Sequence, residues 1–294
     1  MRITNSMLSN TILKNISASY ERLEKYEAQL SSGKLFRRPS DNPITVKQAM
    51  DIRASLKDID QYLGNIEDGI SWLDTADTAL RNASDLLHRA KELAVRGANA
   101  TNSQDELQAI ALEVDQLLEN MISIGNTTFA DRYVFAGHKT TMVPFTNAGS
   151  TVNYNGDSGS ISYEIEKGIT AQVNLPGDNV FKGTTDVFQV LIDLRDHLRA
   201  GNYSAVSQDT SRVDDALDAI TNALTVIGAR TNHLELTRDR QEQAKINLSE
   251  ILSNIEDADL AEVIVKLKME ENVYQSALLT GSMAMQKSLI DFLK

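Results

Sequence analysis

Hydrophobic residues at heptad spacing run through both ends of this chain, where most soluble domains become polar and poorly ordered. Apolar residues spaced by three and four form one face of a helix, and that face stays exposed until another helix covers it. The N-terminal stripe consists of Leu8, Ile12, Ser19, Leu23, Tyr26 and Leu30. The C-terminal stripe consists of Ile264, Leu267, Tyr274, Leu278, Met285, Leu289 and Phe292. Two such helices from opposite chain ends predict a coiled coil made for assembly.

Charge and cysteine content exclude several classes of function. The chain has 41 acidic and 29 basic residues, a net charge of -12, which disfavours binding to nucleic acid or to anionic lipid. It has no cysteine, which excludes disulfides, thiol catalysis and cysteine-ligated zinc. No window of about 18 apolar residues is present, so we expect no membrane insertion. The N-terminus also lacks the apolar run of a cleaved secretory signal.

Proline and glycine divide the sequence into three parts. All four prolines lie at positions 39, 43, 144 and 176, so 44–143 and 177–294 contain no residue that would stop a helix in this way. Seven of the 15 glycines lie within 137–183, where apolar and polar residues alternate at 161–166, as in a strand with one wet face. The prediction is a mainly α fold, an elongated antiparallel helical bundle or coiled coil built from both chain ends, with a small inserted β module.

Capping residues set the expected helix boundaries. Gly33 should end the first helix, and Asn42 with Pro43 should begin the next. A capping box at Ser103 and Glu106 and a similar pair at Asp259 and Glu262 mark two further helix starts.

The same boundaries define the expected domains. These are a terminal coiled coil (1–32 plus 260–294), a helical bundle (33–136 plus 184–259) and the β-rich insert (137–183). Between 235 and 247 polar residues such as Gln241 occupy core-type positions, which predicts a stretch covered on one side only.

Chemistry-bearing motifs give no enzyme signal. The four histidines are scattered without a metal-ligand or catalytic spacing, and Gly156–Gly159, which copies the tetrapeptide around a serine nucleophile, is better read as a turn. No phosphate-binding loop or dinucleotide fingerprint occurs. We therefore expect no catalytic residue, no cofactor and no metal site.

Several segments resemble one family. The stretches Leu30–Lys34, Pro39–Pro43, Glu92–Val95, Ala98–Ser103 and Ile255–Asp259 closely resemble bacterial flagellin-type proteins. Within that superfamily Pro39–Pro43, Arg132–Gly137 and Gly228–Glu235 are more similar to hook-associated junction proteins than to filament flagellins.

The resemblance implies an extracellular structural protein of the bacterial flagellum, exported unfolded through the flagellar type III apparatus without a cleaved signal peptide. It implies a ring of identical subunits between hook and filament, which contacts an adjacent hook-associated protein and flagellin. It also implies a flagellar export chaperone that binds the C-terminal helix. Ten residues of the two terminal stripes are the expected assembly interface: Leu8, Ile12, Leu23, Leu30, Ile264, Leu267, Leu278, Met285, Leu289 and Phe292.

Two alternative functions stay open at this point. The chain could be a filament-forming flagellin or, in another class, a cytoplasmic coiled-coil adaptor. In some flagellins the segment matching Arg89, Leu93 and Glu113 engages an innate immune receptor. The alternative role for these three residues is helix packing and salt bridging.

Overall fold

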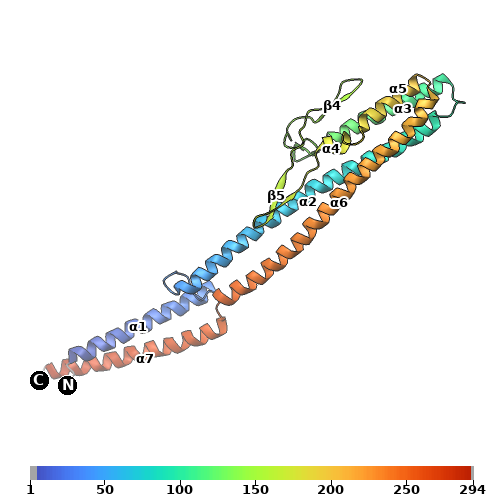
Figure 1. Cartoon of the computed structure of the whole chain (residues 1–294). Helices are drawn as coiled ribbons and strands as arrows, with labels where there is room; N and C mark the ends of the chain where they lie inside the picture. Colours follow the sequence, from blue (N-terminus) through green and yellow to red (C-terminus); the bar gives the residue numbers. More distant parts are fainter. Residues whose placement is uncertain (1–4, 293–294) are drawn as a thin grey trace. The chain divides into compact units, whose positions relative to one another are not determined.

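Helices dominate the computed structural model, which describes the backbone of residues 5–292 and the side chains of residue 7 and residues 9–283 (Figure 1). The elements in chain order are α1 (Asn5–Ser32), α2 (Pro43–Gly97), α3 (Gln104–Gly125), β1 (Thr128–Phe129), β2 (Arg132–Tyr133), β3 (Phe145–Asn147), β4 (Val152–Tyr154), β5 (Ser162–Glu166), β6 (Ile169–Gln172), α4 (Gly177–Phe181), α5 (Val187–Arg199), α6 (Tyr203–Glu256) and α7 (Leu260–Phe292). The expected mainly α class with a small β insert is confirmed.

The chain forms two compact units. Unit 1 contains residues 1–57 and 245–294, and unit 2 contains residues 58–244. The boundaries between the units fall inside α2 and α6. The three-part division expected from the sequence stays a prediction.

The helices begin and end where the capping residues indicate. Gly33 follows α1 with a φ of 68°, which glycine adopts without strain. Asn42 Oδ1 accepts a hydrogen bond from the Thr45 amide at the start of α2. Both halves of the Ser103 capping box are formed at α3. Asp259 Oδ1 accepts hydrogen bonds from the amides of Ala261 and Glu262, so it caps α7.

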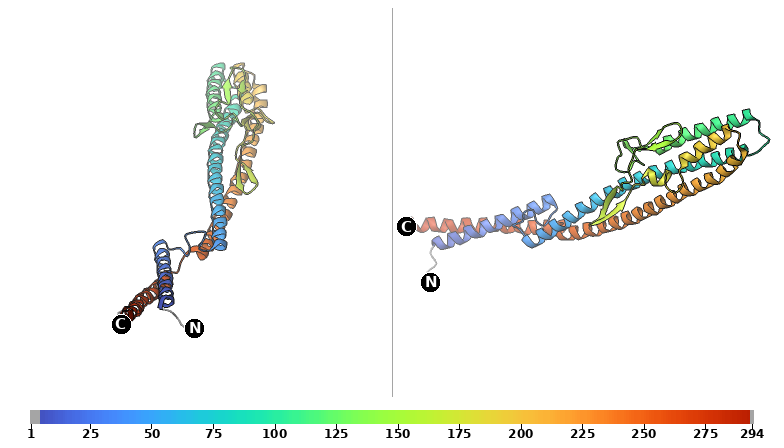
Figure 2. Two further views of the ribbon diagram at one scale, coloured as in Figure 1. Left: turned by 90° about the vertical axis from the view of Figure 1, so that its left-hand side faces the viewer. Right: turned by 45° about the horizontal axis from the view of Figure 1, so that its top comes forward.

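Unit 2 is a four-helix bundle made from α3, α5 and the unit 2 parts of α2 and α6 (Figures 1 and 2). On α2 the heptad-spaced residues Leu73, Leu80 and Leu87 are fully buried. Ion pairs join neighbouring helices, with Lys91 to Asp214 linking α2 to α6 and the buried Arg195 to Asp115 linking α5 to α3. The bundle therefore buries its heptad positions without help from another chain.

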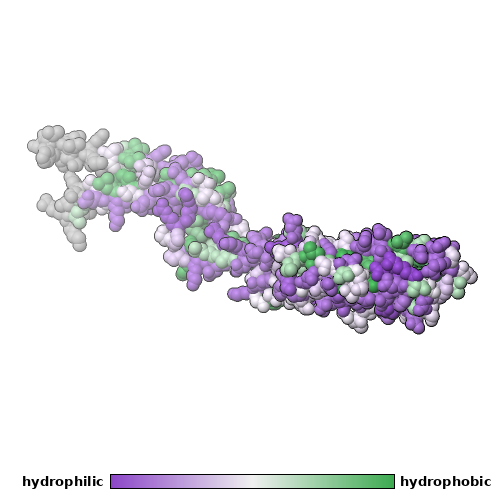
Figure 3. All heavy atoms as spheres, turned by 90° about the horizontal axis from the view of Figure 1, so that it is seen from above, coloured by the Kyte–Doolittle hydropathy of each residue, from purple (hydrophilic) through white to green (hydrophobic). Residues whose placement is uncertain are grey.

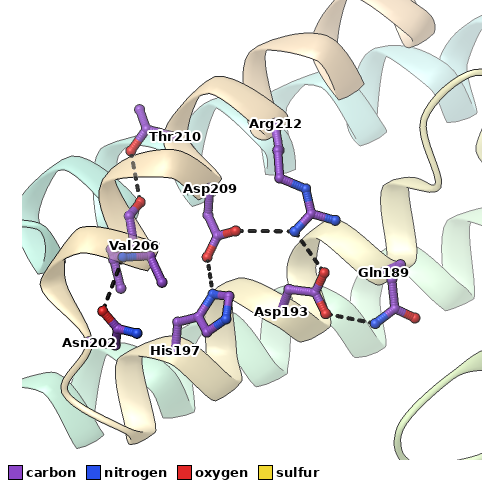
Figure 4. A network of polar contacts seen from close by, with 9 residues as sticks. Gln189, Asp193, His197, Asn202, Val206, Asp209, Thr210 and Arg212 are labelled. Carbon is purple, nitrogen blue, oxygen red and sulfur yellow. Dashed lines mark hydrogen bonds and ion pairs between the residues drawn. The ribbon is translucent and has the colours of Figure 1, made fainter.

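A buried carboxylate also joins α5 to α6 (Figure 4). Asp209 is 1% exposed, and its Oδ2 lies 2.6 Å from His197 Nδ1. Arg212 donates hydrogen bonds to Asp209 and, at 2.7 Å, to Asp193, and the Asp193 carboxylate raises the pKa of Arg212. A buried charge needs polar partners, and this network supplies them to the Asp209 carboxylate, which α6 places inside the bundle.

The strands form three antiparallel hairpins, β1 with β2, β3 with β4 and β5 with β6. A cluster of aromatic rings, Phe135, Phe145, Tyr154, Phe181 and Phe188, joins the β3–β4 region to α4 and α5, with centroids 4.8–5.5 Å apart. The Tyr154 hydroxyl donates to backbone oxygens, and burial raises the pKa of Tyr154 to about 12.

The β5–β6 hairpin covers both α2 and α6. The Asn65 side chain of α2 donates a hydrogen bond to the Glu164 backbone oxygen, and Arg240 of α6 forms an ion pair with Glu166. Gln241, a polar residue at a core-type position, is buried and donates a hydrogen bond to the Ile165 backbone oxygen. Most other residues of 235–247 are exposed, so this stretch of α6 is covered on the side of the hairpin only, as its polar residues at core-type positions predict.

Candidate assembly surface on the terminal helices

Within unit 1, α1 and α7 lie side by side and form what we call the terminal pair (Figures 1 and 2). The face of α7 turned to α1 recurs at heptad spacing, with Val263 and Leu267 4% and 8% exposed. The remaining α7 positions on this face are Glu270, Tyr274, Ala277 and Gly281. On α1 the matching positions are Ile12, Ile16, Ser19, Leu23 and Tyr26.

Close approach explains part of this register. A Cβ atom on Gly281 would lie 3.1 Å from Ile12 and 3.4 Å from Ile16, so the two helices approach tightly near their outer ends. The rings of Tyr20 and Tyr274 lie 6.0 Å apart and add an aromatic contact at one edge of the pair.

A polar layer interrupts the apolar contact. Ser19, 1% exposed, donates its hydroxyl to Glu270, and Arg22 donates to the same carboxylate oxygen at 2.8 Å. The Arg22 guanidinium, followed by the Ser19 hydroxyl, lowers the pKa of Glu270. A polar residue at a core position of a coiled coil fixes register at some cost in stability. The layer therefore aligns α1 with α7.

A second polar cluster in unit 1 joins the segment after α1 to the end of α6. The Gly33–Leu35 segment pairs with the end of α6, through the Leu35 amide to the Glu256 oxygen at 2.7 Å and the Ala258 amide to the Gly33 oxygen at 2.9 Å. Lys34 reaches Glu256 and Asp257, and it lowers the pKa of Asp257. We call Lys34, Arg53, Glu256 and Asp257 the basal clamp, since Arg53 also pairs with Glu256.

The motifs Leu30–Lys34 and Ile255–Asp259 contain three of the four clamp residues, but the sequence pattern did not predict that these motifs contact each other. The signal that could have found it is charge, because Lys34 lies just after α1 and the acidic pair at 256–257 lies at the end of α6. The clamp brings the end of α1 close to the start of α7.

Apolar side chains also cover the faces of the terminal pair that the partner helix leaves open. On α7, Ile264 and Leu278 are each 45% exposed, and further exposed residues are Leu260, Val265, Met269, Val273, Leu279 and Met283. On α1, Met7, Leu13 and Tyr20 are exposed. Figure 3 shows such hydrophobic patches among hydrophilic residues on the face seen there. A helix that is apolar on several faces is one that further chains bury.

The expected interface residues fall into three groups. Ile12 and Leu23 are half-buried and Leu267 is buried within the terminal pair. Leu30, Ile264 and Leu278 are exposed. The side chains of Leu8, Met285, Leu289 and Phe292 lie outside the described residues.

The three residues considered for immune-receptor contact lie in unit 2. Leu93 is 1% exposed and belongs to the bundle core, so its side chain packs. Arg89 pairs with Glu113 at 2.7 Å and with Glu92 at 2.8 Å on the surface. Leu93 therefore has a packing role and Arg89 and Glu113 form a salt bridge, while receptor contact stays a prediction.

Comparison with known families accounts for both outer parts of the chain. Residues 3–140 match the bacterial flagellin N-terminal helical region, and residues 210–293 match the bacterial flagellin C-terminal helical region. The chain belongs to the bacterial flagellin family. This flagellin-family chain is a structural component of the bacterial flagellum and not an enzyme. Within the part of the chain that was described, no helix has the length and apolarity needed to cross a membrane.

Relatives include hook-associated proteins as well as flagellins. Flagellar hook-associated protein 3 of Escherichia coli is 24% identical, over 94% of this chain and 95% of the relative. A flagellin of Halalkalibacterium halodurans is 27% identical, over 90% of this chain and 89% of the relative. The crystal structure of Bacillus cereus FlgL is similar with a TM-score of 0.61 and 25% identity, covering 69% of this chain and 99% of that one.

Proposed function

We propose that this flagellin-family chain joins the hook to the filament as a ring of subunits that polymerises through its terminal helices. The observation that carries the proposal is the apolar surface of α7 that α1 leaves exposed, including Ile264 and Leu278. Burial of apolar area contributes roughly 25 cal/mol per Å², so these side chains favour association strongly once other subunits surround α7.

Similarity to relatives supports the junction role. Hook-associated protein 3 of Escherichia coli matches nearly its whole length, and FlgL of Bacillus cereus shares the fold. The segments Pro39–Pro43, Arg132–Gly137 and Gly228–Glu235 support the same subgroup. Contacts with an adjacent hook-associated protein and with flagellin follow from that position.

Export is part of the same proposal. The chain leaves the cell unfolded through the flagellar type III apparatus, without a cleaved signal peptide, while an export chaperone holds the C-terminal helix. Exposed apolar residues of α7, such as Met269 and Leu279, suit such a partner before assembly. The terminal pair becomes fully buried only in the assembled structure, as a coiled-coil inner layer, and the β hairpins of unit 2 face outward.

A filament-forming flagellin is the second candidate, and the 27% identity to the Halalkalibacterium flagellin favours it. Electron microscopy of a deletion strain separates the two. A junction protein leaves hooks in place while flagellin is lost to the medium. Intact filaments on those hooks would contradict the junction assignment, and long filaments grown from the purified protein alone would favour the flagellin.

Leu278→Asp tests the polymerisation step directly. We expect the variant to be exported and to retain a folded unit 2, but to be absent from purified hook-filament structures. Asn272→Asp is the matched control, since it adds the same charge to an exposed position of α7 without removing an apolar side chain. Normal incorporation of Leu278→Asp would overturn the assembly role of this face.

A further inference from the structure

Arg230 differs from the other arginines of the chain whose pKa is shifted. Carboxylates raise the pKa of Arg22, Arg89 and Arg212, whereas burial alone lowers the pKa of Arg230. Its guanidinium donates hydrogen bonds to the Asn174 backbone oxygen at 2.7 Å and to Gln172 Oε1 at 3.1 Å, and both acceptors are neutral. Among the described side chains, no carboxylate forms an ion pair with it.

Arg230 lies in a pocket of about 310 Å³ between α6 and β6. The pocket is lined by Ala171, Gln172, Val226, Ala229, Arg230, His233 and Leu234. No acidic residue lines it, and a guanidinium has five N–H donors, of which two are used here. His233 adds a second potential donor one helical turn further along. An anionic oxygen placed in the pocket would therefore meet a charge-assisted donor that nothing else neutralises.

A mostly apolar stripe of α6 runs along one side of this pocket. Val226, Ala229, His233 and Leu236 follow one another at a spacing of three and four, so they share one face of α6. Val226 is exposed, and Leu236 is 70% exposed. A free inorganic anion would leave this apolar stripe uncovered, whereas a polypeptide that carries a carboxylate would cover the stripe and neutralise the arginine together.

We propose that the pocket around Arg230 binds an aspartate or glutamate side chain from a second copy of this chain. The inference rests on the proposed polymerisation and adds a specific contact outside the terminal helices. Charge complementarity supports a second copy as the partner, because the chain carries 41 acidic residues against 29 basic ones. A half-buried arginine without an acidic neighbour is locally complementary to the acidic side chains that such copies present.

The alternative is that Arg230 only pins β6 to α6. Two variants separate the roles. Arg230→Gln removes the charge, whereas Arg230→Lys keeps the charge and loses the planar two-donor contact with Asn174 and Gln172. A binding role requires the charge, and a pinning role requires the paired hydrogen bonds.

The experiment replaces Leu236 with the photoreactive residue p-benzoylphenylalanine in the full chain, expressed in flagellated cells. Irradiation of isolated hook-filament structures is expected to give a cross-linked dimer whose partner peptide contains aspartate or glutamate. Arg230→Gln should lower the dimer yield by about tenfold, while Arg230→Lys should keep about half of it. Arg81→Gln, at an exposed arginine elsewhere in unit 2, should change nothing.

Hydrogen exchange of residues 169–174 in the isolated chain gives the second readout. If both Arg230 variants lose the dimer equally and both lose protection there, Arg230 only pins β6 and the proposal is overturned. A full dimer yield with Arg230→Gln also overturns it, as does a partner peptide from another protein. If the wild-type chain is absent from the hook-filament structures, the proposed function fails. If the chain is present but no dimer forms, only this inference fails.

Discussion

Units 1 and 2 use the same helical spacing with different outcomes. In unit 2, Leu73, Leu80 and Leu87 are completely buried between four helices. In unit 1, Leu23 and Tyr26 are half-buried and Leu30 is exposed, because a single partner helix covers one side of α1. Equal periodicity in the sequence thus gives a self-sufficient core where four helices meet, and an incomplete one where two do.

Polar groups differ between the units in the same way. The buried Asp209 of unit 2 lies inside the bundle and is hydrogen-bonded to His197 and Arg212. In unit 1 the polar layer of Ser19 and Glu270 lies within the contact between α1 and α7. The terminal pair is therefore aligned specifically, although its apolar contact is small. Such a pair is suited to further partners, because its register is set before they arrive.

The largest effect should follow from a cavity in unit 2. Leu87→Ala is expected to lower the free energy of unfolding by about 2–5 kcal/mol, since a fully buried leucine loses its contacts and leaves a void. Urea unfolding followed by circular dichroism measures it. Leu112→Ala, at an exposed position of α3, should stay within about 0.5 kcal/mol of the wild type. Equal losses for the two variants would contradict a self-sufficient core in unit 2.

A smaller effect is expected at the basal clamp in unit 1. Glu256→Ala should destabilise the contact between residues 33–35 and the end of α6 by about 1–3 kcal/mol, because two cations lose a buried carboxylate. Hydrogen exchange of the Leu35 amide reports on it. Glu271→Ala, which removes an i,i+3 pair with Lys268, should cost less than about 0.5 kcal/mol. Unchanged exchange at Leu35 in Glu256→Ala would show that the clamp contributes nothing.

The smallest effect concerns acid and the polar layer of the terminal pair. Because the folded-state pKa of Glu270 is lowered from 4.5, the ionised carboxylate stabilises the pair above that pH, and the contribution is lost as the pH falls through the lowered pKa. Spin labels at Leu13→Cys and Leu279→Cys, in a chain without other cysteines, should give a broader distance distribution at pH 3 than at pH 7.

Glu270→Gln is the control for this acid response. The variant should show less difference between the two pH values, since the amide does not titrate. An equally large broadening in Glu270→Gln would assign the acid response to other groups.

Local signals were predictable from the sequence, and tertiary ones only in part. Asn42, Ser103 and Asp259 cap helices as expected, because a capping side chain bonds to amides two or three residues away. The family of the chain was likewise readable, since its motifs lie in the terminal thirds that match the flagellin regions.

The face of α7 was harder to predict. Large apolar residues such as Leu278 dominate the sequence pattern, but Ala277 and Gly281 lie on the face turned to α1. Small residues allow helices to approach closely, and a search for large apolar residues passes over them. The partner of Gln241 was likewise not predictable, since it is a backbone oxygen of a hairpin that lies 76 positions away in sequence.

Gly69 has a consequence for the order in which the chain folds. A Cβ at this position would lie 2.8 Å from Val173 and 3.2 Å from Leu234, so segments more than 160 residues apart meet above one glycine. Contacts at such separation form slowly, because the intervening chain must first be brought together. A chain that emerges N-terminus first therefore holds this part of α2 open until residue 234 has appeared. Unit 2 can therefore complete its fold only after most of the polypeptide has emerged.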